Sequence, residues 1–206
     1  MPFQVKKVFF ENYVFLVWED VYAPAEDSFL FAENLAVKVG DSVVDVGTGC
    51  GILGIIAAEK AARVVAVDVN PYAVRCAKEN AKLNNVADKM FFVQGDLLSP
   101  FRVLGGFDLI LFNAPYLPVD VMEGESWFGR AWAGGVTGRQ VIDRFILEAP
   151  KLLKRNGRIF LMQSTLSDVN ATFERFEENG LKVSVVAKRD LPFFETIVLV
   201  KAEQLS

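Results

Sequence analysis

The sequence predicts an α/β protein built on a doubly wound, mainly parallel sheet with a small N-terminal addition. From residue 42 onward, short apolar stretches alternate with longer stretches of helical periodicity, which is the pattern of βα units in a parallel sheet. Two further apolar stretches, at 181–187 and 194–201, close the chain. Because only residues 188–193 lie between them, and a parallel crossover needs a dozen or more residues, these last two strands must be antiparallel.

The residues before the first core strand are expected to form an extension, 1–40, that packs on the core. Aromatic and β-branched residues at 5–10 and 13–18 flank Glu11-Asn12, which predicts a hairpin. A helical pattern follows over 28–37, and Gly40-Asp41 is expected to end it. We therefore predict a single domain over 1–206.

The core elements follow in regular order. Strands are expected at 42–46, 63–67, 90–94, 107–112 and 158–163, and helices at 52–60, 71–83, within 136–153 and at 168–178. Pro71 suits the first turn of its helix, whereas Pro150 is expected to interrupt the third one. The longest irregular stretch, 117–135, contains two tryptophans, and a loop of that length in a compact domain is usually functional.

Composition excludes several classes of function. The chain is 52% hydrophobic and 23% charged, which indicates a globular protein, and no apolar run approaches the roughly 20 residues of a membrane span. Two cysteines and no histidine predict no metal site and exclude catalysis by histidine. Cys50 and Cys76 are expected to be reduced packing residues, so we expect a cytoplasmic protein.

The charge balance does not favour extended binding to nucleic acid. The net charge is −4, and neutralisation of phosphates by basic side chains dominates such binding. One basic cluster precedes the strand expected at 158–163: Lys151, Lys154, Arg155 and Arg158. We expect it to be the solvated end of a helix, where the helix dipole favours cations.

A glycine-rich turn, Asp45-x-Gly47-x-Gly49-x-Gly51, joins the strand at 42–46 to the next helix. Glycines allow a ligand to approach the backbone, and the helix N-terminus offers free N–H groups. Two interpretations are open. Gly49-x-Gly51-x-x-Gly54 fits the dinucleotide fingerprint, with Asp68 as the ribose acid. Alternatively, this is the acidic turn of S-adenosylmethionine enzymes.

Acids at the ends of three successive strands favour the second interpretation. Asp45 could reach the cofactor's ammonium group, Asp68 would accept from the ribose hydroxyls and Asp96 from the adenine amino group. The closing antiparallel hairpin also favours S-adenosylmethionine as the ligand. Asp96 could instead cap a helix beginning at Leu97.

The tetrapeptide Asn113-Ala114-Pro115-Tyr116 directly follows the strand expected at 107–112. It brings a neutral amide, backbone carbonyls and an aromatic ring to the end of the sheet. The side-chain oxygen of Asn113 and the carbonyl of Ala114 could each accept one N–H of a planar nitrogen group, with Tyr116 packed on it. Pro115 restricts residue 114 to extended geometry. The motif therefore suggests chemistry on a planar nitrogen. The alternative is that it is an ordinary turn after a strand.

Three motifs now carry a family resemblance. They are Val21-Tyr22-Ala23-Pro24-Ala25-Glu26-Asp27-Ser28, the Asn-x-Pro-Tyr motif, and Ala131-Trp132-Ala133-Gly134-Gly135 with Gly138-Arg139 and Asp143-Arg144. The chain resembles the class I methyltransferases of the HemK type, and most closely the eukaryotic and archaeal branch that methylates a glutamine of class 1 translation termination factors. The resemblance implies a seven-stranded Rossmann-like methyltransferase sheet of order 3-2-1-4-5-7-6.

The resemblance also implies a site. S-adenosylmethionine would be the cofactor, S-adenosylhomocysteine the product, and the N5 nitrogen of the glutamine in a Gly-Gly-Gln motif of a release factor the methyl acceptor. The candidate cofactor residues are Ser28, Asp45, Gly47, Thr48, Gly49, Gly51, Asp68, Asp96, Leu97 and Asn113. The candidate catalytic residues are Asn113, Ala114, Pro115 and Tyr116, and the candidate substrate contacts are Asn113, Tyr116, Tyr22 and Trp132. Ser28 could instead cap a helix, and Trp132 could anchor its loop.

The same fold would leave the strand at 90–94 on the edge of the sheet. Its segment Met90-Phe91-Phe92-Val93 is apolar, which is an aggregation hazard unless it is covered. The resemblance implies a cover, a small zinc-binding activator subunit that serves several methyltransferases. Two rival functions stay open, an exocyclic amino-methyltransferase acting on adenine or guanine and a non-catalytic cofactor-binding scaffold.

Overall fold

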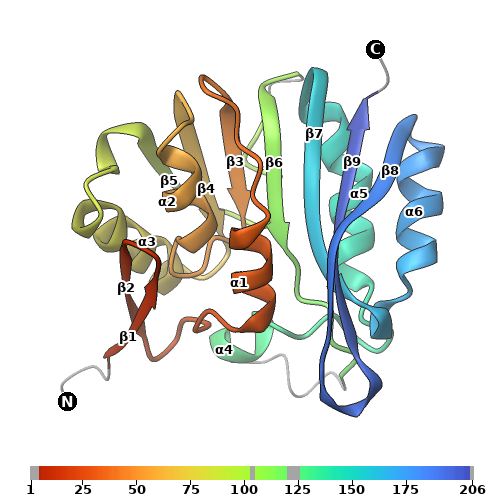
Figure 1. Ribbon diagram of the computed structural model, residues 1–206, viewed down its shortest axis with the longest axis horizontal. Coiled ribbons are helices and arrows are strands. Elements are labelled where there is room, and N and C mark those ends of the chain that lie inside the picture. Colours follow the sequence, from red (N-terminus) through yellow and green to blue (C-terminus); the bar gives the residue numbers. More distant parts are fainter. Residues whose placement is uncertain (1–4, 103–104, 120–125, 205–206) are drawn as a thin grey trace.

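The computed structural model describes residues 5–102, 105–119 and 126–204. A seven-stranded sheet in the order β5-β4-β3-β6-β7-β9-β8 forms its centre (Figure 1). Its strands are β3 (Ser42–Val46), β4 (Arg63–Asp68), β5 (Met90–Gln94), β6 (Phe107–Asn113), β7 (Leu153–Ser164), β8 (Leu181–Asp190) and β9 (Thr196–Gln204). All neighbours are parallel except β9, which is antiparallel to β7 and to β8. The predicted sheet, its order and its closing hairpin are confirmed.

Helices cover both faces of the sheet (Figure 1). One face carries α1 (Glu26–Glu33), α2 (Ile52–Ala58) and α3 (Pro71–Leu83), and the other carries α5 (Gln140–Leu152) and α6 (Val169–Glu178). The remaining helical turns are η1 (Ala87–Lys89), α4 (Trp127–Arg130), η3 (Thr165–Ser167) and η4 (Pro192–Phe194). Every residue of β3 is buried, as expected for a central strand with helices on both sides.

The N-terminal hairpin is confirmed and is fastened to α3. β1 (Val5–Phe10) and β2 (Tyr13–Trp18) pair antiparallel in a sheet of their own. The Asn80 side chain accepts from the Leu16 amide at 2.8 Å and donates to the Leu16 carbonyl at 2.9 Å. Asn84 makes the same pair of bonds with Val14. Two amide side chains therefore act as strand partners for β2.

Three of the differences from the predicted elements have a local cause. α1 starts before Ser28 and ends at Glu33, because the side-chain amide of Asn34 donates to the Leu30 carbonyl and so completes the last turn before Gly40 is reached. α5 runs through Pro150, since a proline in the last turn removes only one hydrogen bond of the helix. β7 begins at Leu153 rather than at residue 158, because Leu153 pairs with Phe107 before an irregularity in the register.

The basic cluster predicted as a solvated helix end lies mostly within β7, because only Lys151 belongs to α5. Arg158 is only 5% exposed. It pairs with Asp41 at 2.6 Å and donates to the carbonyl of Ala36 at 2.7 Å. Lys154 pairs with Asp108 at 2.7 Å. These contacts hold the segment after α1 against the amino-terminal end of the sheet.

Two further observations concern the described residues. Cys50 and Cys76 are both buried and free, as predicted for packing residues. None of the helices in the described ranges has the length and apolar character needed to cross a membrane.

Candidate active site

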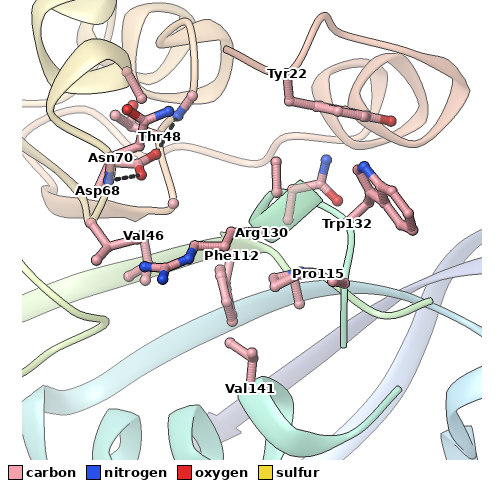
Figure 2. Close-up of a pocket in the computed structure, with 18 of the residues that line it drawn as sticks. Tyr22, Val46, Thr48, Asp68, Asn70, Phe112, Pro115, Arg130, Trp132 and Val141 are labelled. Carbon is pink, nitrogen blue, oxygen red and sulfur yellow. Dashed lines mark hydrogen bonds between the residues drawn. The ribbon is translucent and has the colours of Figure 1, made fainter. Parts of the chain in front are cut away.

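A cavity of about 620 Å³ lies at the carboxyl ends of the parallel strands β3, β4, β5 and β6 (Figure 2). This is the edge at which doubly wound sheets bind their ligands. Asp68 and Asn70 lie toward one end of the cavity, and Tyr22 and Trp132 lie toward the other. The cavity therefore has two parts, one built by the loops after β3, β4 and β5, and one built around Asn113.

Asp45 anchors the glycine turn after β3. Its Oδ2 accepts hydrogen bonds from the Thr48 hydroxyl at 2.6 Å and from the Gly54 amide at 3.0 Å. Burial raises the pKa of Asp45 to about 7, against the effect of these two hydrogen bonds. The carboxyl group is thus poised to lose its proton when a cation binds beside it.

The glycines of this turn have different roles. Gly49 has a φ of +57°, and a Cβ added there would meet nothing within 4 Å, so a ligand can approach its backbone. Gly51 has a φ of +92°, and a Cβ there would lie 3.2 Å from the Cα of Ala77. Gly47, Thr48 and Gly49 line the cavity. Gly51 instead allows close packing of the turn against α3.

Asp68 joins the loops after β3 and β4 (Figure 2). It accepts from the backbone amides of Gly49 and Asn70, at 2.9 Å each. Burial raises the pKa of this carboxyl, although the backbone hydrogen bonds act in the opposite direction. Asp68 therefore ties the glycine turn after β3 to the loop after β4 at this end of the cavity.

Asp96 and Leu97 line the cavity beyond β5. Asp96 is half-exposed and forms an ion pair with Arg144 at 2.5 Å. The segment after Asp96 forms turns rather than a helix, so the alternative reading of Asp96 as a helix cap is wrong. Leu97 is buried and has a φ of +50°.

Asn113 ends β6 and is held from one side only. Its Nδ2 donates to Asp27 Oδ2 and to the Ser28 hydroxyl, at 3.2 Å each. Its Oδ1 is buried and has no hydrogen-bond partner. A buried acceptor without a partner loses the free energy of hydration, so a ligand that donates a hydrogen bond there is favoured.

Asp27 is the functional residue that sequence reasoning left unassigned. It is buried, and it accepts from the Ser28 amide at 2.6 Å and from the Tyr116 hydroxyl at 3.3 Å, in addition to Asn113. Burial and the charge of Asp27 raise the pKa of Tyr116 and of Tyr22 above the usual range. Both phenols therefore stay neutral. The run Glu26-Asp27-Ser28 was visible in the sequence, but no spacing connects it with Asn113.

Ser28 itself is not a helix cap. The N-cap of α1 is Ala25, without a side-chain hydrogen bond. The Ser28 hydroxyl donates to Asp27 Oδ1 at 3.1 Å and accepts from Asn113. The capping interpretation was wrong, and Ser28 lies in the cavity wall.

The loop after α4 braces the Asn-x-Pro-Tyr motif. Leu117 donates to the Trp132 carbonyl at 3.0 Å and accepts from the Gly134 amide at 2.9 Å. A Cβ at Gly138 would lie 2.3 Å from the carbonyl oxygen of Tyr116. Trp132 thus anchors its loop and also lines the cavity. Of the predicted loop 117–135, residues 120–125 lie outside the described residues.

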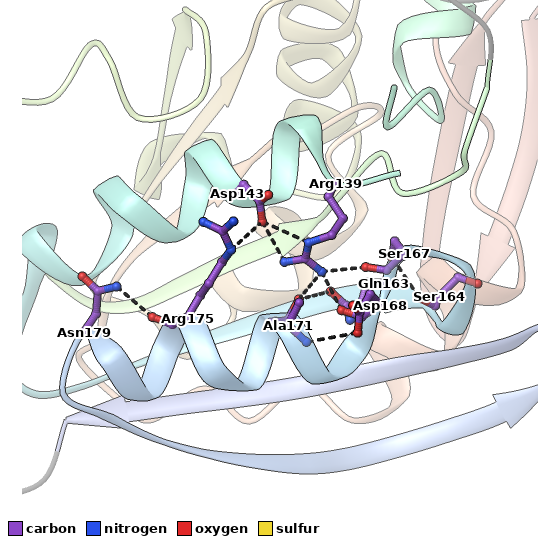
Figure 3. Close-up of polar contacts among 10 residues, drawn as sticks. Arg139, Asp143, Gln163, Ser164, Ser167, Asp168, Ala171, Arg175 and Asn179 are labelled. Carbon is purple, nitrogen blue, oxygen red and sulfur yellow. Dashed lines mark hydrogen bonds and ion pairs between the residues drawn. The ribbon is translucent and has the colours of Figure 1, made fainter. Parts of the chain in front are cut away.

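Arg139 fastens the start of α5 to η3 and α6 (Figure 3). Its guanidinium pairs with Asp143 at 2.7 Å and donates to the carbonyl of Ser167 and the hydroxyl of Thr172, at 2.6 and 3.1 Å. Arg139 is buried and does not line the cavity. It is therefore a structural anchor rather than a substrate contact.

The strand order, the glycine turn followed by acids at strand ends, and the Asn-x-Pro-Tyr motif at the end of β6 define a class I methyltransferase. The family model for ribosomal protein L11 methyltransferase (PrmA) matches residues 28–114. A Methanocaldococcus jannaschii protein, whose name assigns it as a protein N5-glutamine methyltransferase, is 43% identical over 182 residues, which are 87% of this chain and 90% of the relative. The chain belongs to the HemK-type family of protein glutamine methyltransferases.

Two other comparisons agree with this assignment. Methyltransferase HEMK2 of Mus musculus is 32% identical over 176 residues, 80% of this chain and 81% of the relative. The structure of the E. cuniculi Mtq2-Trm112 complex, described as responsible for methylation of the eRF1 translation termination factor, superposes with a TM-score of 0.71. It is 24% identical and covers 90% of this chain and 99% of that chain. At that identity the superposition supports the fold.

Proposed function

We propose that this methyltransferase transfers a methyl group from S-adenosylmethionine to the side-chain nitrogen of a glutamine in a translation release factor. The observation that carries the proposal is the buried Oδ1 of Asn113, an acceptor without a partner in the wall of the cavity. A primary amide N–H is the kind of donor that this atom lacks.

The cofactor part of the cavity fits a nucleoside with a cationic tail. Gly49 leaves its backbone open, and Asp68 lies where ribose hydroxyls could donate to it. Asp45 and Ser28 would lie near the amino and carboxyl groups of the methionine part, and Asp96 and Leu97 near the adenine. When bound, S-adenosylmethionine supplies an electrophilic methyl group and leaves as S-adenosylhomocysteine.

The substrate part orients a weak nucleophile. An amide nitrogen has its lone pair delocalised into the carbonyl, so it needs positioning more than it needs a base. Oδ1 of Asn113 and the carbonyl of Ala114 would each accept one N–H, which aims the lone pair at the methyl group. Positioning of this kind can contribute roughly 7–11 kcal/mol. Both acceptors also stabilise the positive charge that grows on the nitrogen, and the proton can leave after transfer.

Tyr22 and Trp132 would enclose the substrate at the outer end of the cavity, where Figure 2 shows both side chains at the end away from Asp68 and Asn70. Tyr116 would pack on the planar amide, with its hydroxyl held by Asp27. An exocyclic amine of adenine or guanine has similar chemistry. The family membership favours a glutamine over that alternative and over a non-catalytic scaffold.

We also propose that a small zinc-binding activator subunit covers β5, and that the extension and the core act as one domain. β5 is the edge strand of the sheet, and the Phe91 ring on it is 57% exposed. The Mtq2-Trm112 complex gives a precedent for a small partner. If the chain purified alone were soluble and monomeric, with activity unchanged by that subunit, the partner proposal would fail.

Labelled S-adenosylmethionine tests the main proposal. The chain, with and without the activator subunit, is incubated with release factor or with tRNA, and the labelled peptides are mapped. We expect label on the glutamine of the Gly-Gly-Gln peptide, lost with Asn113→Ala and retained with Asn179→Ala, a surface control at the end of α6. Label in tRNA alone would overturn the proposal.

A further inference from the structure

The hairpin β8–β9 reaches past the sheet at the end where the cavity opens (Figure 1). Both strands are longer than the sequence predicts, and the turn between them is short. Its centre is η4 (Pro192–Phe194), closed by a hydrogen bond from the Leu191 amide to the Glu195 carbonyl at 2.8 Å. In Figure 1 the tip of the hairpin lies at the same end of the molecule as α4.

The hairpin is braced on two sides. Arg189 pairs with Glu26 at 2.7 Å and with Glu33 at 2.9 Å, and both glutamates belong to α1, which carries Asp27. On the other side, the Thr196 amide donates to the hydroxyl of Thr165 in η3, at 3.1 Å. Exposed ion pairs stabilise a fold only weakly, so the main result of these contacts is a fixed position for the turn.

The turn lies close to the substrate end of the cavity. The carboxylate of Glu195, directly after η4, adds to the effects of burial and of Asp27 in raising the pKa of Tyr22 and of Tyr116. Both tyrosines line the cavity, whereas Leu191, Pro192, Phe194 and Glu195 are not among its lining residues. The turn is therefore part of the rim.

The fold gives no reason for a phenylalanine at position 194. Its ring is fully exposed, with a relative accessibility of 103%, so it contributes nothing to the core. Its φ is +64°, in the left-handed region that glycine and asparagine adopt with less strain than a bulky residue. An exposed ring on a strained backbone next to an active site indicates a function outside the folded chain.

We propose that Phe194 is a docking residue for the protein substrate, packing on an apolar side chain in the segment that flanks the accepted glutamine. This rests on the proposed function, because it requires a protein substrate. A glutamine whose amide reaches Asn113 leaves its main chain at the mouth of the cavity, beside the turn. Glu195 places a carboxylate at this rim, near enough to act on Tyr22 and Tyr116, and a carboxylate there disfavours the phosphates of a nucleic acid and favours a neutral or basic peptide.

Steady-state methylation of intact release factor by Phe194→Gly and Phe194→Asn tests the docking role. Both replacements suit a positive φ and remove the ring, so we expect melting temperatures equal to or above that of the wild type. The Kd for S-adenosylmethionine should not change, whereas KM for the release factor should rise about tenfold with kcat nearly unchanged, the pattern of lost substrate binding. Phe9→Ala is the matched control, because Phe9 is 66% exposed on β1, at the opposite side of the molecule (Figure 1).

The outcomes separate the two proposals. If the wild type methylates release factor and Phe194→Gly does so with the same KM, the docking proposal is wrong and the proposed function stands. If the wild type transfers no label to release factor, both are wrong. A melting temperature several degrees lower in Phe194→Gly would show that the ring belongs to the fold. Loss of tRNA binding, or of a dimer formed by the wild type, would assign the ring to one of those partners instead.

Discussion

The carboxylate of Asp27 accepts a hydrogen bond from Nδ2 of Asn113 at 3.2 Å. A carboxylate can only accept, so the amide group of Asn113 must turn its nitrogen toward Asp27 and its oxygen away. Asp27 is itself fixed by the Ser28 amide and by the Tyr116 hydroxyl. The orientation of the acceptor in the cavity wall is therefore set by a residue of α1, 86 positions earlier in the chain.

This relationship predicts the effect of Asp27→Asn. An asparagine at 27 can donate or accept, so it allows the Asn113 amide to flip and present a donor to the substrate. We expect kcat to fall about 100-fold, as small losses of positioning can cause, with little change in the Kd for S-adenosylmethionine. Steady-state methylation assays measure kcat, and calorimetry measures the Kd for S-adenosylmethionine. Glu19→Gln, an exposed acid outside the cavity, is the control, and equal activity in the two variants would contradict the positioning role.

The difference between Asp27 and Asp68 shows what sequence reasoning could reach. Asp68 follows a recognisable strand, and acids in that position have a known geometric meaning, so its place at the cavity was predicted. Asp27 meets Asn113 only because α1 folds back across the sheet, and no local pattern encodes such a contact. Arg158 was misjudged for the same reason, because its burial depends on Asp41, far away in the chain. The succession of strands and helices followed from periodicity and the strand order from the family resemblance, whereas the polar networks followed from neither.

The raised pKa of Asp45 makes the stability of the free protein depend on pH. The pKa of its carboxyl is about 7 in the folded protein and 3.8 in the reference state, so the folded chain holds this proton more tightly. The contribution to the free energy of unfolding is complete below about pH 4 and is lost as the pH rises through about 7. At roughly 1.4 kcal/mol per pKa unit, the change is up to about 4 kcal/mol. Urea denaturation at several pH values from 4 to 8 gives the free energy of unfolding at each pH. We expect this free energy to change less with pH in Asp45→Asn than in the wild type, and the raised pKa of Asp68 to leave a remaining change in the same direction.

The raised pKa of Asp45 also leads us to expect proton release when the cofactor binds. Near pH 7 about half of the Asp45 carboxyls are protonated in the free protein, and a cationic ammonium group favours the ionised form. Binding should therefore release a fraction of a proton and become tighter as the pH rises from 6 to 8. Calorimetry in buffers of different ionisation enthalpy measures the released proton. A binding enthalpy that does not depend on the buffer would show that Asp45 does not face the ammonium group.

Replacing Arg139 is expected to lower the stability of the fold rather than to affect the methyl transfer directly. Arg139→Ala would leave the buried carbonyl of Ser167, the partly buried carbonyl of Asp168 and the Thr172 hydroxyl without this donor (Figure 3). We expect the free energy of unfolding to fall by about 3 kcal/mol, as when one partner of a buried pair is removed. Arg175→Ala is the control, because Arg175 contacts the same Asp143 at 3.3 Å but is nearly half-exposed, and we expect it to cost less than about 1 kcal/mol. Equal losses in urea denaturation would contradict the anchoring role.

Gly138 and Gly180 form a matched pair for testing the brace on the catalytic motif. Both have a positive φ, +71° and +76°, so an alanine at either position pays a similar backbone strain of roughly 1–2 kcal/mol. A Cβ at Gly180 would meet nothing within 4 Å, whereas a Cβ at Gly138 would lie 2.3 Å from the Tyr116 carbonyl oxygen. Gly138→Ala must therefore displace the end of the Asn-x-Pro-Tyr motif. We expect kcat to fall about 100-fold in Gly138→Ala and to stay unchanged in Gly180→Ala, with methylation measured well below both melting temperatures. If the two variants kept the same kcat, the loop 131–138 would not control the position of the motif, and its contacts with Leu117 and Tyr116 would serve stability alone.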